Sequence, residues 1–126
     1  CKADLTPKLS IQRSGKFSLN PPVWSALNSD FVEFRQEPDG RVYMQQADPK
    51  TGFKIRPDSG KNKNQRAFNS AALYRIFNSL LQPPAKQRVK SASFEVDLNP
   101  TNQVGVEVII SEPIYINYEF NPDHNV

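Results

Sequence analysis

The central third of the chain gathers side chains whose chemistry suits a polyanionic partner. Its candidate cations are Arg35, Arg41, Lys54, Arg56, Lys61, Lys63 and Arg66. Alternation along the strands predicted there places five side chains on one sheet face: Arg35, Arg41, Tyr43, Lys54 and Arg56. Cations can follow a phosphate backbone while an aromatic ring stacks on a base, so this pattern is typical of a surface that binds single-stranded nucleic acid. A solvated strand face is the alternative interpretation.

The segment from Pro57 to Arg66 reads PDSGKNKNQR and has no apolar residue. Its glycine, asparagine and lysine content predicts a basic loop. Lys61 and Lys63 would therefore add positive charge in the same region of the sequence.

The residues that enzymes commonly use are sparse or placed unfavourably. His124, the single histidine, lies in a polar tail, and the sequence has no Gly-x-Ser-x-Gly motif and no phosphate-binding glycine loop. Glu33, Glu95, Asp97 and Glu107 occupy the polar positions of alternating strands, where a solvated face is the ordinary interpretation. We therefore expect a non-enzymatic protein with no catalytic residue, no metal and no cofactor.

Length and composition indicate one domain. The chain has 126 residues, a formal net charge of +3 and a single cysteine, Cys1, so no internal disulfide is expected. It has no apolar run near the roughly 20 residues that a membrane-spanning helix needs, so we expect no membrane span. A cytoplasmic location is predicted, and a lipid-anchored envelope protein attached through Cys1 is the alternative.

The segment Asn69–Leu81 is predicted to be the main helix. Its large apolar residues recur at helical spacing: Leu73, Ile76, Phe77, Leu80 and Leu81. Asn20 before two prolines predicts a short helix at Pro21–Leu27. The fold expected is α+β, with antiparallel β meanders packed against the one long helix.

The remaining segments read as strands. Alternation on either side of Glu37–Gly40 predicts a hairpin, and a short edge strand is expected at Lys8–Gln12. Two late strands, Val104–Ile110 and Ile114–Phe120, are β-branched and poor in charge, so either could pair with another subunit. The expected organisation is an extended arm at 1–14, a single domain at 15–120 and a loose tail at 121–126.

Part of the chain resembles known modules. The run from Gly15 to Leu27, followed by Phe31–Phe34 and Arg41–Tyr43, resembles the opening of AbrB-type swapped-hairpin DNA-binding modules. It is also similar to small uncharacterised phage and bacterial proteins with this strand, helix and hairpin arrangement. The order of elements from Phe17 to Leu81 is similar, in architecture alone, to PUR and Whirly single-strand binders.

Two functions follow as hypotheses. The first is a bacterial or phage protein that binds single- or double-stranded nucleic acid through the basic sheet face and loop, with little sequence readout. The second is a structural or interaction module, such as a virion component or an envelope protein, that forms a homo-oligomer through the late strands.

Overall fold

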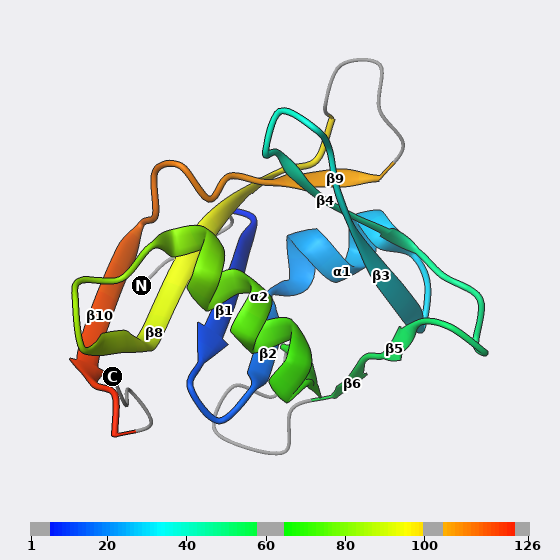
Figure 1. Ribbon diagram of the computed structural model, residues 1–126. Helices are drawn as coiled ribbons and strands as arrows, with labels where there is room; N and C mark the ends of the chain where they lie inside the picture. Colours follow the sequence, from blue (N-terminus) through cyan, green and yellow to red (C-terminus); the bar gives the residue numbers. More distant parts are fainter. Residues whose placement is uncertain (1–5, 58–64, 100–104, 123–126) are drawn as a thin grey trace, which may run out of the picture.

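The computed structural model describes residues 6–57, 65–99 and 105–122, and these form a mostly antiparallel, nearly closed barrel (Figure 1). The strands are β1 (Lys8–Gln12), β2 (Lys16–Leu19), β3 (Phe31–Gln36), β4 (Val42–Gln46), β5 (Phe53–Lys54), β6 (Arg56–Pro57), β7 (Arg66–Asn69), β8 (Gln87–Asp97), β9 (Val106–Val108) and β10 (Tyr115–Phe120). The helices are α1 (Pro21–Leu27) and α2 (Ala71–Leu81). Several expected features lie outside the described residues: Cys1, Lys61, Lys63, His124, the start of the strand predicted from Val104 and most of the predicted tail.

The sheet curls round because its two ends belong to one short segment. The strand order is β5-β3-β4-β9-β8-β1-β2-β7-β6. Strands β5 and β6 are separated only by Ile55, and they pair with β3 and β7 respectively. Strand β8, with 11 residues, pairs with β1 along one edge and with β9 near its end. It therefore belongs to both halves of the barrel.

Alternation on the strands supplies the core. Leu9 and Ile11 of β1 and Phe17 and Leu19 of β2 are fully buried and point into the barrel. The predicted strand at Lys8–Gln12 is confirmed as β1, but it lies between β8 and β2 and not at an edge. Its two buried side chains explain the difference, because an apolar pair in a polar segment is enough to build an interior strand.

Aromatic rings fill the barrel between β3 and β7, which are not paired with each other among the described strands. Phe34 of β3 lies 6.0 Å from Phe68 of β7, centroid to centroid, and Phe68 stacks on Phe53 of β5 at 4.8 Å. Phe77 of α2 reaches the same cluster, 5.4 Å from Phe17 and 5.7 Å from Phe34. The helix thus adds Phe77 to an aromatic cluster that the strands build, and Leu73 and Tyr74 to the wider core.

The expected α+β fold with a sheet packed against one long helix is wrong. Strands make up 46% of the structure and helices 17%. Helix α2 has 11 residues and buries Leu73, Tyr74 and Phe77, whereas Ile76 of the predicted stripe is 52% exposed. The sheet closes on itself, so most inward-pointing strand side chains are buried against the facing strands rather than against the helix.

The capping and spacing signals predicted both helices at nearly their observed positions. The predicted short helix is confirmed as α1, Pro21–Leu27. Helix α2 begins two residues later than predicted because Ser70 is its N-cap, accepting a hydrogen bond from the Leu73 amide at 3.1 Å. It ends at Leu81, followed by Gln82 in the left-handed conformation.

The hairpin predicted around Glu37–Gly40 is confirmed, but the two late strands, predicted at Val104–Ile110 and Ile114–Phe120, do not pair with each other as a meander requires. Strands β3 and β4 pair as expected, with Gly40 at a φ of 95° in the turn. Strand β9 pairs with β8 and β4, whereas β10 pairs with β8 and not with β9. Strands β9 and β10 lie one after the other along the same edge of β8, as Figure 1 shows.

Candidate functional site

The outer side of the β3–β4–β9 sheet, which we call the acidic face, holds three of the predicted site residues. Arg35 and Tyr43 are directly opposite each other, and Tyr43 is opposite Glu107. The Arg35 guanidinium carbon lies 4.7 Å from the centre of the Tyr43 ring, and Tyr43 is 1% exposed. The expectation that Tyr43 is available to stack on a base is therefore wrong, because Arg35 covers the ring.

Carboxylates outnumber cations on the acidic face. Its charged members are Glu33, Glu37, Asp39, Glu107, Arg35 and Arg41. Arg35 forms an ion pair with Glu37, and the Arg41 Nε lies 3.4 Å from the Asp39 Oδ2. A hydrogen bond to Tyr43 and the charges of Asp39 and Glu107 raise the pKa of Arg41. A phosphate backbone would meet net negative charge here.

The other predicted cations lie elsewhere. Lys54 pairs with Phe31 at the far end of β3 from Arg35, about 13 Å away along the strand. Arg56 pairs with Ala67, and Arg66 lies one residue earlier on β7. Alternation places Lys54 on the same side of β3 as Glu33 and Arg35, but at the opposite end of the strand. The predicted site residues therefore fall into two groups: the acidic face and a second group at the β5–β6–β7 junction.

Trp24 and Asp30 complete this second group. We call the whole group the basic end: Lys54, Arg56, Arg66, Trp24 and Asp30. The guanidinium carbon of Arg66 lies 4.0 Å from the centre of the Trp24 ring, and its NH1 atom lies 3.7 Å from the Asp30 Oδ1. Trp24 is on α1 and Asp30 directly precedes β3. Nothing in the sequence linked Trp24 or Asp30 to Arg66.

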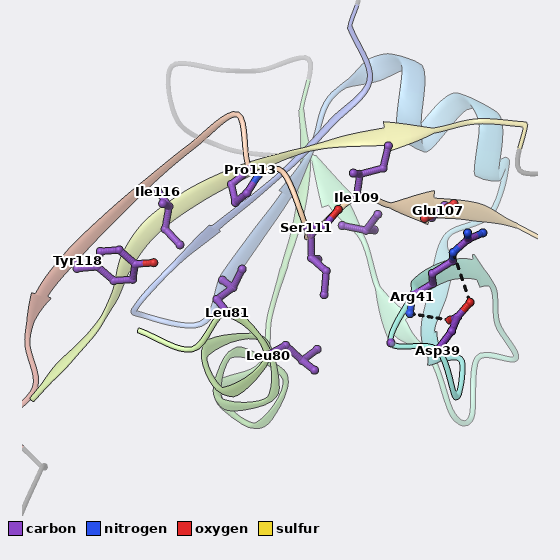
Figure 2. A pocket seen from close by; sticks show the side chains of 13 residues that line it. Asp39, Arg41, Leu80, Leu81, Glu107, Ile109, Ser111, Pro113, Ile116 and Tyr118 are labelled. Carbon is purple, nitrogen blue, oxygen red and sulfur yellow. Dashed lines mark hydrogen bonds and ion pairs between the residues drawn. The ribbon is translucent and has the colours of Figure 1, made fainter. Parts of the chain in front are cut away.

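A groove of about 640 Å³, lined by both apolar and charged residues, lies between α2 and the segment that joins β9 to β10. Figure 2 shows Leu80 and Leu81 at the end of α2, with Ile116 and Tyr118 of β10 nearby. The Arg41–Asp39 pair stands at the opposite end of the groove. Sequence reasoning missed this groove because it depends on how three distant segments meet.

Strand β10 forms one wall of the groove and is itself unusually apolar on its surface. Phe120 is 69% exposed, and Ile114 and Tyr115 are each 47% exposed. Three of the four exposed large apolar residues of the described chain thus lie in β10 or directly before it. Among the described strands, β10 pairs with β8 alone, so one of its edges is unpaired.

Charged side chains fix β10 to β8. Glu119 lies opposite Arg88, whose Nε donates to Glu119 Oε2 at 2.8 Å, and the Arg13 NH1 is 3.2 Å from the same oxygen. Burial raises the pKa of Glu119, but the hydrogen bond from Arg88 and the charges of Arg13, Arg88 and Lys90 outweigh burial and lower it overall. Glu119 is therefore held as a carboxylate.

Comparison with known proteins gives no further guide, since no family model, curated protein or solved structure matches the chain. The resemblance to AbrB-type, PUR and Whirly modules is neither supported nor contradicted. Within residues 6–57, 65–99 and 105–122, no helix is long and apolar enough to cross a membrane. The same residues contain no group of three or more side chains suited to a metal ion.

Proposed function

We propose that the protein is an interaction module that associates with a second copy of itself by joining the two β10 strands edge to edge. The observation that carries this proposal is the combination of an unpaired strand edge with three exposed large apolar side chains at Ile114, Tyr115 and Phe120. An unpaired edge offers backbone donors and acceptors to another strand, and exposed apolar side chains gain free energy when that strand covers them.

A comparison with β3 supports the choice of edge. Strand β5 pairs only with Phe31 and Val32, so no described strand covers β3 from Glu33 to Gln36 on that side. That stretch carries Glu33 and Arg35, and charged residues are a common natural protection against edge pairing. Strand β10 has the sequence YINYEF and only one charged residue, Glu119, which is already held by Arg13 and Arg88.

The sequence of β10 favours one antiparallel register. The Asn121 amide donates to Lys86 O, and Asn117 and Tyr115 pair with Ser91 and Ser93, so alternation directs the amides of Ile116 and Tyr118 toward the free edge. Pairing Asn117 with Asn117 of the second copy would join these amides to carbonyls. The same register sets Ile116 opposite Tyr118 and Ile114 opposite Phe120, so apolar residues meet apolar residues.

Because the two copies are related by a twofold axis at Asn117, each pair of different residues occurs twice. Two Ile116–Tyr118 pairs and two Ile114–Phe120 pairs would form, each contributing roughly 0.2–1 kcal/mol. Ile116 and Tyr118 also line the groove beside α2, so the second copy would extend that surface. These side-chain terms add to the backbone hydrogen bonds of the joined edges.

Sedimentation velocity and light scattering across a dilution series test the proposal. The wild-type chain should show a reversible rise to twice its mass as concentration increases. Phe120→Lys should weaken this association at least about tenfold, because it replaces two apolar contacts in the dimer with charges and a tenfold change requires only about 1.4 kcal/mol.

Ile76→Lys is the matched control, since Ile76 is equally apolar and 52% exposed but lies on α2. It should leave the mass distribution as in the wild type. A wild-type chain that remains monomeric at every concentration would overturn the proposal, as would equal losses from the two substitutions.

The acidic face does not favour the nucleic-acid hypothesis, because Arg35 and Arg41 have acidic partners and Tyr43 is covered. Nucleic-acid binding stays a prediction for the cations at the basic end. It does not depend on β10.

A further inference from the structure

The basic end brings together residues from four elements, α1, β5, β6 and β7, and from the turn before β3. Strand β5 pairs with the start of β3 and β6 pairs with β7, so Lys54, Arg56 and Arg66 converge on the segment Phe53–Pro57. The Ile55 amide donates to Asp30 O at 2.9 Å, which fixes this segment against the residue preceding β3. Backbone pairing therefore holds the three cations near one another.

Arg66 lies at the centre of this group. Trp24 supports one side of its guanidinium at 4.0 Å, and Asp30 lies 3.7 Å from its NH1 atom. Two hollows of about 440 and 410 Å³ share Arg66 and Asp30 in their walls. Trp24, Ser25 and Asn28 line the first, and Lys54, Arg56 and Pro57 line the second.

The charge balance here is opposite to that of the acidic face. Lys54, Arg56 and Arg66 face a single carboxylate, Asp30, so the described residues leave two positive charges in excess. Lys54 and Arg56 are exposed. An anion can therefore approach Lys54 and Arg56 without breaking the ion pair between Arg66 and Asp30.

We infer that the basic end binds single-stranded nucleic acid, with Lys54 and Arg56 on phosphates and a base stacked on Arg66. A guanidinium plane is a recognised platform for an unpaired base, and Trp24 holds this plane in place. The neighbouring hollow at Lys54 and Arg56 is where the adjoining phosphate would lie. A phosphate alone would use the charges but not the Arg66–Trp24 stack.

The full chain can be titrated with oligothymidylate while the fluorescence of Trp24, its single tryptophan, is recorded. Anisotropy of a labelled oligonucleotide gives the affinity independently. We expect the tryptophan signal to change on binding and the affinity to fall with salt, with a log–log slope of about −1.4, because each of the two phosphate contacts contributes about 0.7. Inorganic polyphosphate, which lacks bases, should bind more weakly.

Two substitutions separate stacking from charge. Arg66→Lys keeps the positive charge but removes the plane, and should weaken oligonucleotide binding about fivefold or more. Lys54→Ala, at an exposed position, should reduce the salt slope by about 0.7. Arg41→Ala on the acidic face is the matched control and should change neither value.

Three results would overturn the inference. They are no oligonucleotide binding at low salt, polyphosphate binding as tight as that of the oligonucleotide, and an Arg41→Ala loss equal to those of the basic-end variants. The second result would indicate a site for anions in general. Phe120→Lys should leave oligonucleotide affinity unchanged, so this test and that of the β10 association fail independently.

Discussion

Glu119 is the residue that connects the free strand to the barrel. It is the one charged residue of β10, and it accepts from Arg88 at 2.8 Å with Arg13 3.2 Å away. Both arginines lie on the barrel, Arg88 in β8 and Arg13 directly after β1. The exposed edge of β10 is thus presented by a strand whose other side is fixed by charge as well as by backbone pairing.

The lowered pKa of Glu119 sets a pH dependence. A carboxyl group whose pKa is lower in the folded state than in the unfolded state stabilises the fold above the unfolded value, about 4.3, and this contribution is lost as the pH falls. We therefore expect Glu119→Gln to destabilise the protein near neutral pH and to cost progressively less below about pH 4. Urea unfolding of both chains at a series of pH values measures this difference.

Glu112→Gln controls for the loss of one negative charge, because Glu112 is exposed in the connection between β9 and β10. If Glu119→Gln had the same effect at pH 7 and in acid, the ion pairs with Arg13 and Arg88 would not stabilise the fold.

Tyr43 and Arg66 show which features of the site could not be predicted from the sequence. Alternation assigned Tyr43 correctly to the polar side of its strand, yet the ring is buried because Arg35 of the neighbouring strand lies over it. A polar strand position therefore does not imply an exposed one. The contact between Arg66 and Trp24 was equally beyond prediction, since 41 intervening residues separate them in the chain.

At the scale of elements, α2 packs on the barrel through Leu73, Tyr74 and Phe77, and Phe77 is the most deeply buried of the three. Phe77 is fully enclosed and lies within about 6 Å of Phe17, Phe34 and Phe94, centroid to centroid. Ile76, its neighbour in the predicted stripe, points outward. The helix thus closes a gap in the barrel and does not cover a sheet face.

Phe77→Ala should lower the free energy of unfolding by about 3–5 kcal/mol, because it opens a cavity among the rings. Ile76→Ala, at the exposed neighbouring position, should change it by no more than about 0.5 kcal/mol. Thermal and chemical unfolding of the two variants measures both values. Similar losses from the two would mean that the predicted five-residue stripe, and not its buried residues alone, anchors the helix.

The elements themselves were largely predictable, and their partners were not. The short helix, the β3–β4 hairpin and most strand positions follow from spacing and turn residues near each one. The central place of β1 and the pairing of β10 with β8 depend on contacts across about 80 and 25 residues of chain, which alternation does not encode. Closure of the barrel follows from those pairings.

At the scale of the whole molecule, closure of the barrel places acidic and basic side chains on different surfaces. Strands β3, β4 and β9 carry the acidic face, whereas Lys54, Arg56 and Arg66 gather at the β5–β6–β7 junction. One stretch of basic sequence is therefore divided between two surfaces of opposite character. The β10 edge is a third surface, and it is apolar.

The amides of Ile116 and Tyr118 test the β10 association most directly, because alternation points both toward the free edge. Hydrogen exchange followed residue by residue by NMR, at low and high protein concentration, measures their protection. The account predicts that both amides exchange more slowly as concentration rises in the wild type, and that Phe120→Lys abolishes this change. Rapid exchange of both amides at every concentration would contradict it.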